Sequence, residues 1–239
     1  MPQTASYLMR LTERTRLSDT ACDDLIIKIS LEPLDGNPVH HFIAGQYVRI
    51  GMPQMKEPAP AYFAIASSPY DQGAYEFVIK ASQGISQYLV DLPLGSELEI
   101  EGPIGKGFDL SAHRGQHVIL LGVGTGIAPL RSLWHSLIPE RHDYGNISIY
   151  AGFLTPMHCL LTEEMSELSA HQIDISVSLT SGHDNWDGPV GYVQHALADD
   201  APPPDNTIVC LAGMSAMVDA CTETLHNLGF NDDQILLNF

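Results

Sequence analysis

The segment from His117 to Pro129 restricts the fold of this chain more than any other part of the sequence. It is a short apolar run followed by Gly122, Gly124 and Gly126 and then by a proline. Such a run, bounded by turn residues, is typical of a buried strand, and glycine lets the main chain turn sharply close to a ligand. Pro129 fits the first turn of a helix, where its missing N–H costs nothing. The segment therefore predicts a strand, a tight turn and a helix whose free N–H groups can face a phosphate.

The spacing of these glycines leaves two interpretations open. The usual dinucleotide fingerprint is G-x-G-x-x-G, whereas this segment has G-x-G-x-G. A glycine turn before a helix can also be only a tight connection in an α/β sheet. The segment alone does not decide between nucleotide binding and a structural turn, so the rest of the chain has to be considered.

After residue 117 the sequence alternates between short apolar runs and amphipathic stretches. This alternation predicts a parallel sheet covered by helices on both faces. We expect strands at 118–121, 147–151, 173–179, 207–212 and 234–237, and helices at 127–138, 161–170, 190–198 and 216–228.

Small residues follow four of these expected strands. They are Gly122–Gly126, Gly152, Ser181–Gly182 and Gly213–Met214. Ligands of α/β sheets bind beyond the carboxyl ends of the strands. Small residues at four such ends indicate a groove that is kept open, which favours nucleotide binding over a purely structural turn.

The first half of the chain has a different pattern, with short strand-like segments separated by turn residues. Several short strands of this kind predict a sandwich or a small barrel. The strands are expected at 25–31, 46–50, 62–66, 75–80 and 97–102, with one short helix at 85–91. We place the domain boundary in the polar stretch 111–116, which gives domains of residues 1–112 and 113–239.

Charge and composition exclude several classes of function. The formal net charge is −18, so the chain is expected to repel nucleic acid and anionic membranes. No apolar run approaches the ~20 residues that cross a bilayer, and the N-terminus lacks the pattern of a secretory signal. The four cysteines contain no C-x-x-C pair, and the histidines show no metal-ligand spacing. We expect a cytoplasmic protein without a bound metal.

Several motifs occur in the same order as in one known family. They are Ala44–Val48, Tyr62–Pro69, Gly84–Ser86, Gly95–Phe108, Gly122–Pro129, Leu211–Met214 with Met217, and the C-terminal Leu237–Phe239. Together they resemble the ferredoxin–NADP reductase superfamily of flavoprotein oxidoreductases over nearly the whole chain. The resemblance implies an N-terminal antiparallel β-barrel that binds FAD and a C-terminal α/β domain with a five-stranded parallel sheet that binds a nicotinamide nucleotide.

The resemblance also implies which residues form the two binding sites. The flavin would contact Tyr62, Phe63, Ala64, Ile65, Ala66, Ser67, Lys80, Gly84, Ile85, Ser86 and, at the C-terminus, Phe239. The nicotinamide nucleotide would contact Gly122, Gly124, Thr125, Gly126, Ile127, Gly152, Ser181, Gly213, Met214 and Met217. No residue is expected to act as an obligatory acid or base, because the cofactors carry the chemistry of hydride transfer.

Three positions depart from the pattern of the family. Ala61 replaces an arginine that would clamp a flavin phosphate, Ala64 replaces a hydroxyl residue beside the flavin ring, and Ala212 replaces a cysteine beside the nicotinamide. Two alternatives follow. Flavin still binds, through Phe63, main-chain amides, the helix start at 84–86 and another cation such as Arg49, Lys80 or Lys106. Otherwise flavin is lost, and the chain is a non-catalytic nucleotide-binding module that regulates a partner.

The expected reaction is hydride transfer from NADH to FAD, followed by electron transfer to a small-molecule or protein acceptor that the sequence does not identify. NADPH is less favoured than NADH because residues 142–239 contain no Lys or Arg to pair with its 2′-phosphate. An acidic ferredoxin is not expected as the acceptor, because a chain with a charge of −18 would repel it.

Overall fold

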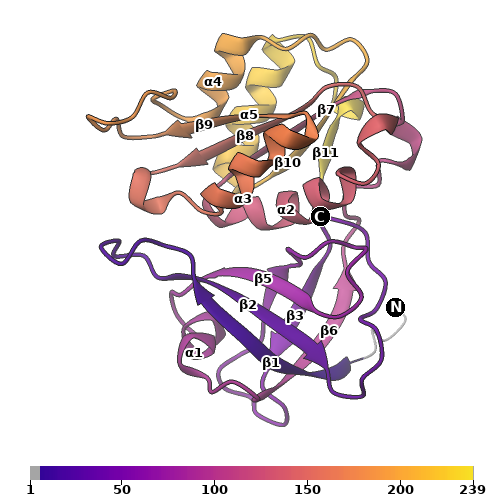
Figure 1. The fold of residues 1–239 in the computed structure, drawn as a ribbon, viewed down its shortest axis with the longest axis vertical. Coiled ribbons are helices and arrows are strands. Elements are labelled where there is room, and N and C mark those ends of the chain that lie inside the picture. The colour runs from indigo at the N-terminus through magenta and orange to yellow at the C-terminus, as the bar shows by residue number, and fades with distance from the viewer. Residues whose placement is uncertain (1–5, 239) are drawn as a thin grey trace.

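The computed structural model describes residues 6–238, and it contains two sheets that lie one above the other (Figure 1). The first sheet belongs to the N-terminal half of the chain and is antiparallel. The second sheet belongs to the C-terminal half and is parallel. The predicted fold class is thereby confirmed, whereas the expectation for Phe239 lies outside the described residues.

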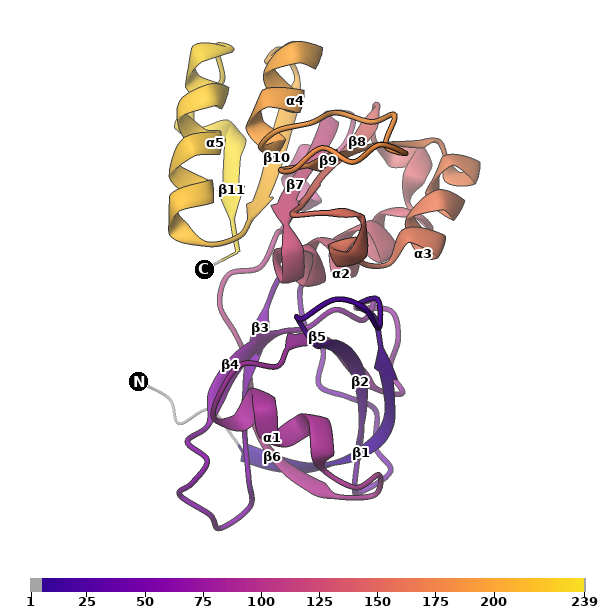
Figure 2. The same cartoon turned by 90° about the vertical axis from the view of Figure 1, so that its left-hand side faces the viewer.

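The N-terminal sheet has six strands in the order β4-β3-β6-β1-β2-β5 and curls around an apolar core (Figure 2). Ile85 and Leu89 of the helix α1 are buried in that core, so α1 covers the barrel. Beyond β4, the N–H of Ala66 donates to the main-chain oxygen of Glu76 at 2.7 Å, which links the two edges of the sheet. The elements are β1 Ser6–Arg16, β2 Ile26–Pro33, β3 Tyr47–Gly51, β4 Ala61–Ala64, β5 Tyr75–Lys80, α1 Ile85–Asp91 and β6 Glu97–Ile104.

β1, the longest strand of the barrel, is not among the strands that the sequence predicts. Its buried side chains are Met9 and Leu11, and its register against β2 shifts between Leu11 and Glu13. Such a bulge breaks the alternation of apolar and polar residues that identifies a strand in a sequence. Most of the remaining positions are polar or charged, and the apolar Leu8 is exposed, so no long apolar run marks this segment.

The C-terminal sheet has five parallel strands in the order β11-β10-β7-β8-β9. The helices α2 and α3 pack on one face, and α4 and α5 pack on the other. From β7 the strands are added outward to β8 and β9, and the chain then returns to place β10 on the other side of β7. This switch point between β7 and β10 is the usual place for a ligand in such a sheet. The elements are β7 His117–Val123, α2 Ile127–Leu137, β8 Ile147–Phe153, α3 Thr162–Glu167, β9 Ile173–Leu179, α4 Val193–Asp200, β10 Thr207–Ala212, α5 Ser215–Asn227 and β11 Ile235–Leu237.

Two helices differ from the expected ranges by more than one residue. The helix expected at 190–198 is α4, which begins at Val193 because Val190 forms a bridge with Leu179 and Gly191 has a φ of +128°. The stretch expected as a helix at 161–170 is divided into α3 and a 3₁₀ turn, η5 (Leu168–His171). The other 3₁₀ turns are η1 Ser111–His113, η2 Gly124–Gly126, η3 Arg141–Asp143, η4 Pro156–His158 and η6 Asp232–Gln234.

The two halves share an apolar interface. Ala66 and Phe108 of the first half and Trp134 of α2 belong to one buried cluster, and Trp134 is fully buried. We place the domain boundary between residues 112 and 113, within η1, as proposed from the sequence. Among residues 6–238, no helix combines the length and the apolar character needed to span a membrane.

Candidate nucleotide site between the two halves

A cleft of about 1020 Å³ opens between the barrel and the parallel sheet. The barrel contributes Tyr47, Tyr62, Ala64 and Lys80 to its wall. The other half contributes the loop after β7, the end of β8 and the residues after β10, including Gly124, Thr125, Gly126, Gly152, Gly213 and Met214. The cleft therefore lies at the carboxyl ends of the parallel strands, where the sequence placed the nucleotide.

The glycines of the loop after β7 serve different purposes. A Cβ on Gly126 would lie 2.9 Å from the main-chain oxygen of Ala212, and one on Gly122 would lie 2.7 Å from Cδ1 of Leu130. These two glycines allow β7, α2 and β10 to pack closely. Gly124 has a φ of +52° and open space around its Cβ position, so it lets the chain turn and leaves the cleft clear.

The start of α2 faces the cleft without a side-chain cap. No side chain caps η2 or α2, and Pro129 lies in the first turn of α2. The N–H of Ile127 bonds to the oxygens of Gly124 and Thr125 and is thereby used within the loop. An uncapped helix start is favourable for an anion, because the helix dipole and its unpaired N–H groups both attract negative charge.

Two aromatic residues of the barrel, Tyr47 and Tyr62, line the cleft, and Tyr62 is the more exposed of the two. Its side chain is 63% exposed, and its ring meets that of Tyr47 edge to face at 5.6 Å between centroids. From the sequence, Phe63 is expected to stack on the flavin ring. In the structure Phe63 packs partly against the core of the barrel and lines the second hollow described below, but it does not line the cleft.

A second hollow of about 400 Å³ continues from the cleft over the barrel. It runs between β4, the end of β5 and the start of α1, and it shares Tyr62, Ala64, Lys80 and Thr125 with the cleft. Phe63, Gly84, Ile85 and Ser86 also line it. The two spaces together can accommodate an extended ligand that begins between the two halves and ends beside α1.

Lys80 is paired with an acid at the edge of the cleft. Its Nζ lies 2.6 Å from Oδ2 of Asp24, and Nε2 of His158 lies 3.7 Å from the same oxygen. Asp24 and His158 line the cleft but were not identified from the sequence, because they come from distant loops without a motif. Of the other cations considered, Arg49 bonds to Glu101 at 2.7 Å, and neither Arg49 nor Lys106 lines the cleft or the second hollow.

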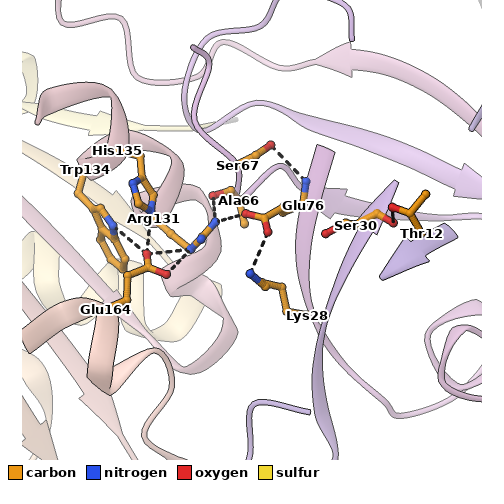
Figure 3. A network of polar contacts seen from close by, with 10 residues as sticks. All are labelled: Thr12, Lys28, Ser30, Ala66, Ser67, Glu76, Arg131, Trp134, His135 and Glu164. Carbon is orange, nitrogen blue, oxygen red and sulfur yellow. Dashed lines mark hydrogen bonds and ion pairs between the residues drawn. The ribbon is translucent and has the colours of Figure 1, made fainter. Parts of the chain in front are cut away.

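A network of ion pairs joins the barrel to α2 and α3 beside the cleft (Figure 3). Nη1 of the buried Arg131 donates to the oxygen of Ala66 at 2.8 Å and to Glu76 at 2.6 Å. Nε of the same residue donates to Glu164 at 2.9 Å. Trp134 and His135 also contact Glu164, at 3.2 and 2.8 Å, and Lys28 bonds to Glu76 at 2.8 Å. The network fixes the segment after β4 against the helix that follows the glycine loop.

Both acids of this network are held in their charged form. Burial opposes the charge of Glu76, but the charge of Arg131 and the hydrogen bond from Lys28 outweigh it and lower the pKa. Burial likewise opposes the charge of Glu164, but the hydrogen bond with His135 and the charge of Arg131 lower its pKa. Arg131 is only 6% exposed, so its pairs are screened little by solvent.

Most of the residues expected from the sequence line one of the two spaces, and six do not. Ile65, Ala66 and Ser67 are buried: Ala66 accepts from Arg131, and the Ser67 hydroxyl accepts from the N–H of Glu76. Gly122 and Ile127 support the loop, and at the end of β9 the cleft is lined by Thr180 rather than by Ser181. Those that line the cleft or the hollow are Tyr62, Phe63, Ala64, Lys80, Gly84, Ile85, Ser86, Gly124, Thr125, Gly126, Gly152, Gly213, Met214 and Met217.

Two family models match consecutive parts of the chain. The model described as an oxidoreductase FAD-binding domain matches residues 9–108, and the model described as an oxidoreductase NAD-binding domain matches residues 120–223. The second hollow is lined mainly by residues of the first match, and the glycine loop belongs to the second. The two matches therefore place FAD against the barrel and NAD against the parallel sheet.

Curated relatives are named reductases or subunits of redox enzymes. The chain is 28% identical over 200 residues to sulfhydrogenase 1 subunit gamma of Pyrococcus furiosus, which covers 82% of this chain and 67% of the relative. It is 28% identical over 234 residues to NADH-cytochrome b5 reductase 1 of Neosartorya fischeri, which covers 92% and 74%. It is also 28% identical over 175 residues to NADH-cytochrome b5 reductase 1 of Dictyostelium discoideum. That match covers 71% of this chain and 61% of the relative, so the chain spans less than two thirds of that relative's length.

Solved structures with the same fold cover nearly the whole chain. The ferredoxin reductase in carbazole 1,9a-dioxygenase has a TM-score of 0.82 at 22% identity, covering 98% of this chain and 69% of its own. A ferredoxin NADP+ reductase from Neisseria gonorrhoeae with bound FAD and NADP has a TM-score of 0.79 at 18% identity, covering 97% of each chain. At this identity the likeness shows the fold, and the family models add the cofactors. The chain therefore belongs to the ferredoxin–NADP reductase superfamily, as an oxidoreductase with an FAD-binding domain followed by an NAD-binding domain.

Proposed function

We propose that this protein passes a hydride from NADH to FAD and then passes the electrons to a separate acceptor. The observation that carries the proposal is the cleft itself, whose walls are the flavin side of the barrel and the glycine loop of the parallel sheet. Thr125 lines both the cleft and the hollow over the barrel, so both ligands would meet beside it. Close contact between a flavin ring and a nicotinamide ring is what hydride transfer requires.

The residues of the cleft fit a flavin ring. Tyr62 offers an exposed aromatic face, Ala64 leaves space beside it, and Tyr47 supports Tyr62 from the side. The remainder of the flavin would run into the second hollow along Gly84, Ile85 and Ser86. When bound, FAD supplies the electron-accepting centre, and the chain contributes binding, orientation and exclusion of water. We keep Phe239 as a proposed contact of the flavin on the resemblance alone.

The nicotinamide nucleotide would be held by the loop after β7 and the start of α2. Gly124, Thr125 and Gly126 would bring main-chain N–H groups to its phosphates, and Gly152, Gly213, Met214 and Met217 would line the rest of its path. We propose that NADH is preferred over NADPH. The part of the chain from residue 142 onwards has no Lys or Arg, so a 2′-phosphate would find no fixed cation there.

We propose the class of electron acceptor by excluding the partners that a strongly acidic chain repels. The chain has a net charge of −18, so it would repel an acidic ferredoxin, nucleic acid or an anionic membrane through long-range electrostatics. A small molecule or a neutral or basic protein remains as the acceptor. We propose the cytoplasm as the location, where the free thiols of Cys22, Cys159, Cys210 and Cys221 would stay reduced.

A second candidate is a regulatory module that binds a nucleotide without catalysis. Its support is the loss of polar groups at Ala61, Ala64 and Ala212, all of which line the cleft or the second hollow. Two measurements separate the candidates: the quenching of flavin fluorescence when the protein is titrated with FAD, and the oxidation of NADH in the presence of FAD and a dye acceptor. Flavin binding with NADH-dependent dye reduction supports the enzyme. Protein that takes up no FAD and leaves NADH unchanged supports the regulatory module.

A further inference from the structure

The second hollow, which continues the cleft over the barrel, carries very little positive charge. Among the described residues, Lys80 is the one Lys or Arg that lines it. The ammonium of Lys80 lies 2.6 Å from the carboxylate of Asp24, so this charge is already balanced. At the position of Ala61, on the wall of the same hollow, the side chain ends at the methyl group.

The remaining polar side chains of the hollow are neutral, and the hydroxyls of two of them, Ser82 and Ser86, already contact each other at 3.3 Å. The Ser86 hydroxyl donates to the oxygen of Gln83 at 2.9 Å and accepts from the N–H of Ser82 at 3.3 Å. Lys56 is exposed on the loop before β4 and lines neither the cleft nor the hollow. A phosphate that enters the hollow would therefore meet neutral donors and one cation that an acid already holds.

This arrangement weakens the contribution of phosphate to flavin binding. Tight phosphate sites use Arg or Lys in charge-assisted hydrogen bonds, which are about twice as strong as neutral ones. The net charge of −18 adds a general repulsion of phosphate. The aromatic face of Tyr62 and the space beside Ala64 attract the ring, by contrast, without any charge.

We propose that the flavin site recognises the isoalloxazine ring and the ribityl chain and discriminates little between riboflavin, FMN and FAD. This inference rests on the proposed function and deepens it, because a flavin held mainly by its ring exchanges with flavin in solution. Free flavin then becomes the class of acceptor. NADH gives a hydride, which carries two electrons and one proton, and water gives a second proton, so that NAD+ and a fully reduced flavin leave the protein.

The test is a separate titration of the flavin-free protein with riboflavin, FMN and FAD, in which the quenching of flavin fluorescence reports binding. We expect three dissociation constants within about tenfold of one another, with little change between low salt and about 0.15 M salt. FMN or FAD binding about 100-fold more tightly than riboflavin, with a gap that narrows as salt is added, overturns the inference. No binding of any of the three flavins would instead overturn the proposed function.

A pair of variants at one position tests where the phosphates lie. Ala61→Arg places a guanidinium in the hollow, whereas Ala61→Gln places an uncharged side chain there. We expect Ala61→Arg to tighten FMN and FAD about tenfold or more relative to riboflavin, and Ala61→Gln to leave the ratio as in the unmodified protein. An unchanged ratio in a folded Ala61→Arg protein overturns the inference. Where Ala61→Arg does not fold, the titration of the unmodified chain still decides.

Discussion

Arg131 donates a hydrogen bond of 2.8 Å to the main-chain oxygen of Ala66, and these two residues come from different halves of the molecule. Ala66 follows the strand β4, whose residues line the cleft on the flavin side. Arg131 lies on α2, directly after the glycine loop. The same guanidinium bonds to Glu76 and Glu164. The bond between Arg131 and Ala66 therefore fixes the two cofactor-binding surfaces relative to each other.

Replacing Arg131 is predicted to destabilise the protein strongly. Arg131→Met leaves the buried carboxylates of Glu76 and Glu164 without their shared partner, and breaking a buried pair in this way costs about 3–5 kcal/mol. The free energy of unfolding from urea titration measures the loss. Arg114→Met is the matched control, because the Arg114 side chain is 51% exposed and its pairs with Glu140 and Asp143 should contribute about 1 kcal/mol or less. Equal losses in the free energy of unfolding would show that the buried network contributes no more to stability than an exposed ion pair does.

The same network predicts how stability depends on pH. Folding lowers the pKa of Glu76 and of Glu164, so their contribution is fully present above the pKa of an unfolded glutamate and is lost as pH falls through the folded values. We expect the free energy of unfolding to be steady near neutral pH and to fall below about pH 4. Glu164→Gln should flatten this acid dependence, whereas Glu163→Gln, at the exposed neighbour on α3, should not. Identical acid profiles for both variants would contradict the assignment.

Tyr62 is predicted to provide the aromatic contact to the flavin, and Phe63 is not. Tyr62→Ala should weaken FAD binding about tenfold, since a close aromatic contact contributes about 0.5–1.5 kcal/mol beyond its buried area. Tyr62→Phe keeps the ring and should bind FAD as the unmodified protein does. Phe63→Leu keeps an apolar side chain on the wall of the second hollow, so it should lower the melting temperature through the barrel core while weakening FAD binding less than Tyr62→Ala does. If Phe63→Leu weakened FAD binding more than Tyr62→Ala did, Phe63 and not Tyr62 would be the residue that stacks on the flavin.

Two glycines offer a matched test of the nicotinamide loop. Gly124 and Gly36 both have positive φ angles, +52° and +71°, and both have open space at the Cβ position. Alanine at either site should cost about 1 kcal/mol of stability through backbone strain. Only Gly124 lines the cleft, so only Gly124→Ala should raise the dissociation constant of NADH, by about tenfold or more. An equal affinity for NADH in both variants would show that the nucleotide does not bind against the loop that contains Gly124.

Four elements could be predicted from the sequence to the residue. β5, β9, β10 and α1 have the predicted bounds, because turn residues flank each of them. β1 could not be predicted in this way, because its bulge and its charged positions hide the two buried side chains, Met9 and Leu11. Local pattern is thus sufficient only where one face of the element is buried without interruption.

The candidate site was predictable where a motif carries it and not where distant residues meet. The loop from Gly122 to Gly126 and the segment from Tyr62 to Ser67 are local. Gly124–Gly126 and Tyr62–Ala64 line the cleft or the second hollow, whereas Gly122 and Ile65–Ser67 are buried and line neither. The contacts of Asp24 with Lys80 and His158, and of Arg131 with Glu76 and Glu164, join side chains far apart in the chain. Their partners are set by how the two sheets pack, which no single segment encodes.

We propose that the cleft holds the flavin ring against the nicotinamide, and anaerobic mixing of the FAD-loaded protein with NADH, and separately with NADPH, measures whether it does. We expect rapid loss of the flavin absorption band near about 450 nm with NADH, and at low salt a rate with NADPH that is lower by about tenfold or more. Bleaching with NADH that is no faster than that of free FAD would rule out this arrangement of the two rings, and faster bleaching with NADPH would rule out the proposed preference for NADH.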